Sequence, residues 1–276
     1  MLEIYKFEAM TTHCELQIYC NNKSVADSCA KDILYECKRL EKKYNYYSEH
    51  SYLYSINTRQ TNVLDSETKN LLRLSQHYYK ETNGIFDVTI ATLKNINIEK
   101  EKLLQATGCE HFKIKKDKII FTNDYTKIDL GGFVKEYSVN RAIKIIKKYK
   151  ITSALVNFGG DIYAHGRKPN NTKFIVGIKN PKFTNENIIN IEIENKALTT
   201  SALYEREGHI LSKNKLNSDI LSATVISNCC IKSGVYSTSF IASKNLDIKL
   251  DHSLINDRLE IKTVNDSVYN SKSLNN

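Results

Sequence analysis

Apolar residues near the start of the chain follow first a two-residue period and then a helical one. Over residues 3–20 they alternate with polar residues and break at 10–12, which predicts two strands joined by a tight turn. From Ser24, a residue type that caps helix N-termini, apolar residues recur at helical spacing as far as Tyr46, so we predict a helix there. The polar segment 46–60 loses this period and is predicted to be a loop.

A second amphipathic segment starts at Ser66 and ends at Asn83-Gly84, residue types that suit a left-handed helix end. It predicts a helix over 66–82, and the segment that follows, which includes 86–93, is predicted to be a loop. Further along, the pattern predicts a short helix at 99–107 and a meander of strands at 112–114, 118–122 and 126–130.

The second half of the chain opens with a long predicted helix directly after Gly131-Gly132. Short strand-like segments follow at close spacing, and a last helix is predicted at 229–242. Links this short favour antiparallel pairing, because parallel neighbours need a crossover of about a dozen residues. We therefore predict an α+β fold of mainly antiparallel sheets with helices packed on one side. It forms one domain with two lobes over 1–264, and a polar tail follows at 265–276. The predicted strands are 153–158, 162–166, 174–179, 188–193, 197–201 and 220–227.

The net charge of +9 arises from 40 Lys and Arg against 31 Asp and Glu. Such an excess fits a nucleic-acid surface, an anionic membrane or an acidic small ligand. The basic residues are scattered over amphipathic segments, as at Lys144 and Lys147, which is typical of solvated helix faces. Because the aromatic-basic motif of an RNA-binding sheet is also missing, the sequence does not favour nucleic acid as a partner.

Targeting signals and cysteines bear on the compartment. The first residues lack the apolar core and cleavage site of a signal peptide, and no apolar run reaches the roughly 18 residues that span a bilayer. The 7 cysteines form no CxxC pair and no zinc spacing, which indicates reduced, mostly buried thiols. We expect a cytoplasmic protein without a membrane span, or an exported, periplasmic one if a leader precedes this sequence.

Four polar segments follow predicted elements and are predicted to form one site: IFDVT, IDLGGFVKEY, NFGGDIYAHG and LTTSALYEREGH. Within the second, Asp129-Leu-Gly-Gly before a helix suits an anion, since glycines permit close approach and a helix start offers N–H groups. Lys135, one turn further on, adds a positive charge. The same residues also fit a plain strand-to-helix turn.

Other polar residues leave two interpretations open. The Gly159-Gly160-Asp161 turn belongs to neither a GxGxxG motif nor a P-loop, and it fits a tight turn as well as a ligand contact. Asp87 and Asp129 fit contacts to a metal, a ribose or a ring, or simple turn capping. His209 fits a general base or an inert surface histidine. From the residues alone, the prediction stops at an α+β protein with a phosphate-containing ligand.

In their order, these segments resemble the ApbE-like family of FAD:protein FMN transferases from about Phe7 to Ala242. FEAMTTHCEL resembles the family's MGT turn, TNGIFDVTIATL its "tnGaFDvTvgpL", and KIDLGGFVKEYSVNRA its "vDlgaiaKGyavDra". The segments ALVNFGGDIYAHGRK and ALTTSALYERE are similar to "alvnlGGdiya.G" and "avaTSGdYer", and ATVISNCCIKSGVYSTSFIAS to the segment with "aDalsT". The resemblance implies an ApbE-like, T-fold-like architecture with the flavin between the two halves.

The resemblance also implies roles for individual residues. His209 would take the proton from an acceptor hydroxyl, and Lys135 would hold the FAD pyrophosphate. Magnesium would be held at Gly132, through its carbonyl oxygen, and at the positions of Gly234 and Thr238. The implied FAD contacts, of which Tyr47 and Phe86 offer stacking surfaces, are Met10, Tyr47, Ile85, Phe86, Asp87, Asp129, Lys135 and Leu211.

The chain departs from the family pattern at three motif positions. Gly234 stands where the family has its metal-binding Asp, Thr11 where the MGT turn has Gly, and Glu136 where the KGY motif has Gly. The H-x-x-D-P-x-x-G pattern is replaced by HILSKNK. The missing Asp matters most, because magnesium sites usually rely on carboxylates; Ser237 and Asp161 are the candidates to compensate.

The activity implied by the resemblance is magnesium-dependent transfer of FMN from FAD to a Thr or Ser of an acceptor flavoprotein, with release of AMP. The implied acceptor is a protein such as an FMN-binding subunit of a membrane electron-transfer complex. Two alternatives stay open. One, favoured by the missing carboxylate at Gly234, is an FAD-binding relative with weakened or lost transfer. The other is an FAD pyrophosphatase, whose chemistry differs only in that water attacks in place of a hydroxyl.

Overall fold

The centre of the protein is an eight-stranded sheet. The computed structural model describes residues 1–183, 185–203, 216, 219–243, 250–256, 258 and 260–264. The strand order is β1-β2-β5-β6-β9-β10-β11-β12, and every neighbouring pair is antiparallel. The strands are β1 Leu2–Ala9, β2 Thr12–Tyr19, β5 Ser153–Phe158, β6 Asp161–His165, β9 Lys196–Ala202, β10 Ser222–Ser227, β11 Asp251–Ile255 and β12 Ile261–Val264.

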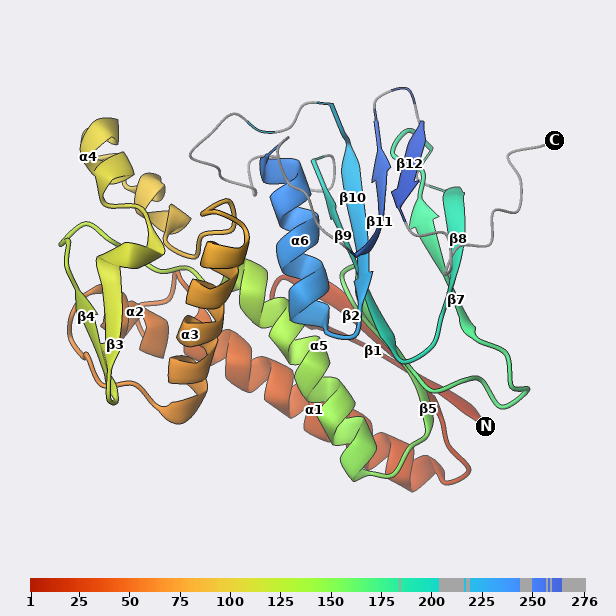
Figure 1. Cartoon of the computed structure of the whole chain (residues 1–276). Coiled ribbons are helices and arrows are strands. Elements are labelled where there is room, and N and C mark those ends of the chain that lie inside the picture. Colours follow the sequence, from red (N-terminus) through yellow and green to blue (C-terminus); the bar gives the residue numbers. More distant parts are fainter. Residues whose placement is uncertain are drawn as a thin grey trace.

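Helices cover one face of this sheet, and a hairpin of β7 and β8 covers the opposite face (Figure 1). Helix α6 contacts β9 and β10, α5 contacts β5 and β6, and α1 packs beside α5. The helices α2, α3 and α4 and the hairpin of β3 and β4 lie beyond the N-terminal end of α5. The bounds are α1 Lys23–Tyr44, α2 Tyr52–Asn57, α3 Ser66–Glu81, α4 Lys100–Gln105, α5 Gly131–Lys148, α6 Cys230–Ala242, β3 Phe112–Lys115, β4 Lys118–Phe121, β7 Phe174–Lys179 and β8 Asn187–Ile193, with 3-10 turns η1 Ile90–Lys94 and η2 Cys109–His111.

The burial pattern of each strand follows from this layering. Strand β10 is buried at all of its positions because α6 lies on one side and the β7–β8 hairpin on the other. Strand β7 instead alternates buried and exposed residues, since only one of its faces meets the sheet. The alternation that predicted β7 from the sequence is therefore the pattern of a strand with one solvated face.

The predicted strand at 126–130 is wrong. This segment has no strand partner. Its Lys127 and Ile128 backbone groups are hydrogen-bonded to side chains of distant residues, and the Asp129 amide donates to the Val88 carbonyl at 2.8 Å. Asn57 Nδ2 donates to the Ile128 carbonyl (2.7 Å), Asn57 Oδ1 accepts from the Ile128 amide (2.8 Å), and Thr92 Oγ1 accepts from the Lys127 amide (2.9 Å). The two buried side chains thus replace the neighbouring strand that a meander would have supplied.

Short elements account for the other differences. The predicted loop 46–60 includes helix α2, whose N-terminus is capped by Ser51 Oγ, the acceptor for the Tyr54 amide at 3.0 Å. The predicted loop around 86–93 overlaps η1, and the first helix begins at Lys23 with Asn22 as its cap instead of Ser24. Strands β11 and β12 were not predicted. Helix α2 and the 3-10 turn η1 have six and five residues, which is too short for a clear helical period.

The predicted class is confirmed as a mixture of helices and antiparallel sheet. All seven cysteines are free thiols, and five of them are buried, as predicted. Among the described residues, no helix combines the length and apolarity that crossing a bilayer requires. The predicted tail at 265–276 lies outside the described residues.

Candidate functional site

Helix α5 begins with an exposed pair of glycines that leaves its backbone accessible. A Cβ atom at Gly132 would meet nothing within 4 Å, and Gly131 is also exposed. Asp129 orients this start, since its Oδ1 accepts from the Gly131 amide at 2.8 Å. An anion can therefore approach the positive end of the α5 dipole closely.

Lys94, which sequence reasoning did not single out, lies beside this helix start. Its Nζ is 2.8 Å from Asp129 Oδ2 and 3.1 Å from the Tyr47 hydroxyl, and it lies over the Tyr46 and Tyr47 rings at 4.6 and 5.0 Å from their centroids. Burial alone would lower the pKa of Lys94, but Asp129 outweighs burial and raises it. The lysine therefore stays a cation at neutral pH.

The two predicted stacking residues differ in exposure. Tyr47 is 77% exposed and presents its ring to solvent beside Lys94. Phe86 is only 8% exposed and packs against Phe133, with 5.8 Å between ring centroids. Of the two, Tyr47 is the ring that a flat ligand can reach, whereas Phe86 anchors its loop in the core.

The remaining predicted flavin contacts occupy two turns. Ile85 and Asp87 flank Phe86, and Asp87 Oδ1 accepts from the amide (2.8 Å) and hydroxyl (2.6 Å) of Thr89, which fixes the turn. Met10 lies in the β1–β2 turn, where its amide donates to Glu41 Oε1 at 2.7 Å. Met10 and Ile85 both pack against the hydrophobic cluster that contains Phe86. The Asp87 segment is also hydrogen-bonded to the start of α5, because the Asp129 amide donates to the Val88 carbonyl at 2.8 Å.

Two buried carboxylates and a partly exposed lysine form a charged group one turn into α5. Lys135 Nζ lies 2.7 Å from Asp161 Oδ2, and the carboxylates of Asp161 and Glu136 are both almost fully buried. Burial, and then the negative charge of Asp161, raise the pKa of Glu136 well above its ordinary value. Burial also raises the pKa of Asp161, although Lys135 opposes this shift. Two carboxylates thus face a single cation.

Helix α6 borders this group with hydroxyl and backbone oxygens. Ser201 Oγ lies 2.9 Å from Ser237 Oγ and 3.1 Å from Thr238 Oγ1, and Ser237 Oγ donates to the Gly234 carbonyl at 3.1 Å. Oxygen donors of this kind, together with the carboxylates of Glu136 and Asp161, are those that magnesium prefers. Among the described residues, no set of three or more His, Cys, Asp or Glu side chains could hold a metal. A cation here would therefore also need hydroxyls, backbone oxygens or substrate phosphates as ligands.

The four polar segments predicted to form one site do meet in the described residues. The Asp87 and Asp129 segments are joined by a backbone hydrogen bond, Asp161 pairs with Lys135, and Thr199 is the strand partner of Asp161. His209 and Leu211 lie outside the described residues, so their predicted roles stay predictions. The residues that sequence reasoning missed are Lys94, hidden in a segment predicted to be a loop, and Glu136 as a neighbour of Gly234.

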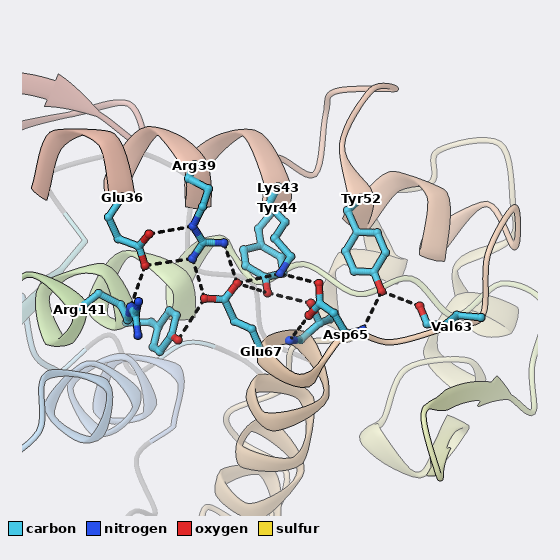
Figure 2. Close-up of polar contacts among 11 residues, drawn as sticks. Glu36, Arg39, Lys43, Tyr44, Tyr52, Val63, Asp65, Glu67 and Arg141 are labelled. Carbon is cyan, nitrogen blue, oxygen red and sulfur yellow. Dashed lines mark hydrogen bonds and ion pairs between the residues drawn. The ribbon is translucent and has the colours of Figure 1, made fainter. Parts of the chain in front are cut away.

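A second charged group holds the helices that frame the site. Figure 2 shows it between α1, α3 and α5. Arg39 bridges Glu36 and Glu67 with N–O distances of 2.7 Å each, Lys43 bonds Glu67 at 2.7 Å, and Arg141 of α5 bonds Glu36 at 2.7 Å. Because Arg141 belongs to the same helix as Lys135, this group fixes the helix on which the site is built.

Comparisons with known proteins show which family and fold this chain shares. Residues 10–250 match the model of the ApbE family. An FAD:protein FMN transferase of Buchnera aphidicola subsp. Baizongia pistaciae is 27% identical over 191 residues, which cover 59% of this chain and 56% of the relative. A protein of the same name from Klebsiella pneumoniae is 27% identical over 124 residues, covering 41% of this chain and 37% of the relative. The matched region thus spans about half or less of these curated relatives' length.

Solved structures match the fold over almost the whole chain. The ApbE protein of Thermotoga maritima has a TM-score of 0.81 at 22% identity and covers 95% of this chain and 97% of its own. The apo flavinyl transferase ApbE of Pseudomonas stutzeri has a TM-score of 0.81 at 15% identity, with 98% of both chains covered. At these identities the structures show a shared fold, whereas the family match extends over most of the sequence. This chain belongs to the ApbE family.

Proposed function

We propose that this protein is an FAD:protein FMN transferase. It breaks the pyrophosphate bond of FAD, transfers the FMN half to a Thr or Ser hydroxyl of an acceptor flavoprotein and releases AMP. The acceptor class we propose is an FMN-binding protein, such as a subunit of a membrane electron-transfer complex. Family membership supports the proposal, as do relatives that are themselves named FAD:protein FMN transferase.

The observation that supports this proposal best is the start of α5. It combines an accessible helix N-terminus at Gly131 and Gly132 with two lysines, Lys94 before it and Lys135 one turn into it. A pyrophosphate has two negatively charged phosphates, which a helix dipole and two cations stabilise together. Tyr47 adds an exposed ring beside Lys94 for one of the flat ends of FAD.

Phosphoryl transfer needs few covalent groups from the protein but accurate charge placement. Lys135 is fixed by Asp161 and therefore offers a cation at a defined position. A bound magnesium ion would neutralise charge on the pyrophosphate, and Glu136, Asp161 and Thr238 fit its preference for oxygen ligands. His209 is the proposed base that accepts the proton of the attacking hydroxyl.

A direct test combines the full chain with FAD, magnesium chloride and a tagged FMN-binding acceptor domain. Intact-mass spectrometry should show an FMN adduct on the acceptor, and chromatography should show an equal amount of AMP. The His209→Ala variant should bind FAD but form no adduct. An acceptor variant with Ala at its target hydroxyl is the matched control and should stay unmodified.

The same assay separates the two alternatives. FMN and AMP released into solution without an adduct would identify an FAD pyrophosphatase. FAD bound without cleavage, seen as quenched flavin fluorescence with no AMP, would identify a relative that binds FAD without transferring it. A chain that neither quenches flavin fluorescence nor releases AMP would refute the flavin function as a whole.

A further inference from the structure

Glu136 of α5 lies against the one residue of α6 that has no side chain to oppose it. A Cβ atom built on Gly234 would lie 2.6 Å from Glu136 Cγ, 2.7 Å from Oε1 and 2.9 Å from Cδ. Real Cβ atoms do not approach other atoms this closely, so the Glu136 carboxyl fills the space that a side chain at 234 would need. Glycine at 234 and glutamate at 136 are therefore mutually dependent.

The Glu136 carboxyl lies where it lacks a compensating partner. The residue is 5% exposed, and among the described residues its buried Oε2 has no hydrogen-bond partner. The neighbouring cation, Lys135, pairs with Asp161 at 2.7 Å. A buried carboxylate oxygen without a partner costs free energy unless a proton or a cation joins it. The fold therefore keeps an unsatisfied oxygen at this position.

The surroundings of Glu136 supply further oxygen atoms. Thr238 lies one helical turn beyond Gly234 on the same face of α6, and its hydroxyl is 3.1 Å from Ser201 Oγ. Asp161 is the first residue of β6 and lies next to its strand partner Thr199. Figure 1 shows α5 and α6 side by side over these strands. Glu136 thus lies against Gly234, one helical turn before Thr238 on α6, and Asp161 pairs with Lys135 of the same helix as Glu136.

We propose that Glu136 is the carboxylate ligand of a divalent cation bound between α5 and α6, and that it replaces, from α5, the carboxylate that α6 lacks at Gly234. The two departures from the family pattern, at 136 and at 234, are then one exchange, in which the carboxylate ligand is supplied by α5 instead of α6. The inference rests on the proposed function only for the cation's role in transfer. The cation site itself follows from the contacts of Glu136.

The exchange makes an unusual stability prediction. Gly234→Asp alone should lower the melting temperature, because the new side chain collides with Glu136 and adds a further buried carboxylate. Glu136→Gly alone should leave a cavity. The double variant Glu136→Gly with Gly234→Asp should melt closer to the original chain than the sum of the two single effects, which a double-mutant cycle would measure.

Cation binding is the decisive readout. Mn²⁺ would be titrated into the full chain by calorimetry, alone and with ADP as a pyrophosphate probe. Loss of an outer-shell partner alone costs about 10- to 100-fold in metal affinity. Glu136→Gln, which keeps the shape of the side chain but changes a direct ligand, should therefore weaken Mn²⁺ binding by at least about 10-fold, and the double exchange variant should regain most of it. Glu101→Gln, an exposed change on α4, is the matched control and should bind Mn²⁺ like the original chain.

A second measurement distinguishes a ligand from a structural residue. In EDTA, Glu136→Gln should melt at the same temperature as the original chain or higher, because it removes one of two neighbouring buried carboxylates. The rise in melting temperature that Mn²⁺ gives the original chain should be absent from this variant. A purely structural Glu136 would give the reverse, a lower melting temperature in EDTA with an unchanged Mn²⁺ increment.

The outcomes separate this inference from the proposed function. If Glu136→Gln abolishes Mn²⁺ binding while the original chain forms no FMN adduct, the cation site stands and the transferase proposal falls. If the original chain forms the adduct and Glu136→Gln binds Mn²⁺ within about twofold of it, the transferase stands and this inference is overturned. Failure of the original chain to bind Mn²⁺ with or without ADP would also overturn it.

Discussion

Helix α5 contributes residues to two charged groups, which differ in how completely their charges are paired. The group in Figure 2 contains three carboxylates, Glu36, Asp65 and Glu67, and three cations, Arg39, Lys43 and Arg141, and each carboxylate has a cation within 2.7 Å. The group around Lys135 has one cation for the two carboxylates of Glu136 and Asp161.

The difference teaches where to expect function. Charges that are paired among themselves stabilise the fold and need nothing further, whereas a buried excess of one sign is tolerated where a ligand completes it. We call the start of α5, the group around Lys135 and the neighbouring β1–β2 turn the site side of the molecule. It has another unfavourable feature, because Thr11 in the β1–β2 turn has a φ of 58°. The group in Figure 2 and the helices that it joins, which we call the framework, therefore stabilise the fold, whereas the site side contains groups that lower its stability.

The largest expected effect is the loss of Glu67 from the paired group. Glu67→Ala leaves Arg39 and Lys43 without their shared carboxylate, and Tyr137 also loses its bond to Glu67. Since these side chains are partly buried, we expect a loss of about 2–3 kcal/mol of unfolding free energy. Urea unfolding followed by circular dichroism would measure it.

The matched control for this loss is an exposed pair. Lys23 and Asp27 form an ion pair in which both side chains are well exposed, at 62% and 47%. Lys23→Ala should therefore cost less than about 1 kcal/mol. Equal losses for Glu67→Ala and Lys23→Ala would show that the paired group adds nothing special to stability.

The paired group should also lose stability in acid. Burial would raise the pKa of Glu67, but Arg39 and Lys43 outweigh it and lower the pKa from 4.5 to about 2. A carboxylate whose pKa is lower in the folded state stabilises the protein fully above its unfolded pKa. That stability is lost as the pH falls from about 4.5 towards 2.

The measurement compares the original chain with Glu67→Gln between pH 6 and pH 3. The stability difference between them should shrink as the pH falls, by up to roughly 2 kcal/mol after allowing for the partial exposure of Glu67. Glu36→Gln should behave in the same direction, because Arg39, against the effect of burial, lowers the pKa of Glu36. A difference that stays constant with pH would contradict the assigned ion pairs.

On the site side, removing a cation should affect the ligand more than the fold. Lys94→Met keeps the side-chain stem but removes the charge that lies between Asp129 and Tyr47. We expect FAD affinity to fall about 10-fold, equivalent to about 1.4 kcal/mol, with a smaller change in stability. Fluorescence quenching of FAD would measure the affinity.

Lys102→Met is the control for this test, because Lys102 is exposed on α4 and pairs only with Glu99 among the contacts of the described residues, at 3.0 Å. Its FAD affinity should match that of the original chain. If Lys94→Met lowers the unfolding free energy but leaves the FAD affinity unchanged, Lys94 belongs to the framework. Our assignment of Lys94 to the site side would then be wrong.

The elements that could be predicted are those whose pattern is local. Helices α1 and α3 and strands β5 to β9 show their period over enough residues to place them within a few positions. The segment 126–130 shows an alternation too, yet the backbone of Lys127 and Ile128 is hydrogen-bonded to the side chains of Thr92 and Asn57, which are distant in sequence. No local pattern reveals a partner of this kind.

The site residues that could be predicted are likewise those that lie close together in the sequence. Asp129, the glycine pair and Lys135 could be found because they follow one another at the start of one helix. The contact between Glu136 and Gly234 joins two helices that are far apart in the chain, so each position looked like an independent loss. Only the packing of α5 against α6 shows that the two changes fill the same space.

The smallest expected effect concerns strain in the turn that borders the site. Thr11 adopts a φ of 58°, a left-handed conformation that disfavours β-branched residues, in a two-residue link between Ala9 and Thr12 of paired strands. Thr11→Gly should relieve this strain and stabilise the protein by about 0.5–1 kcal/mol, less than the full strain because glycine also gains freedom in the unfolded chain. Thermal unfolding would measure the gain.

Asn83→Gly, at the left-handed end of α3, is the matched comparison. Because asparagine tolerates that conformation, its gain in unfolding free energy should be only a few tenths of a kcal/mol. A Thr11→Gly variant no more stable than Asn83→Gly would mean that the site side stores no strain in this turn.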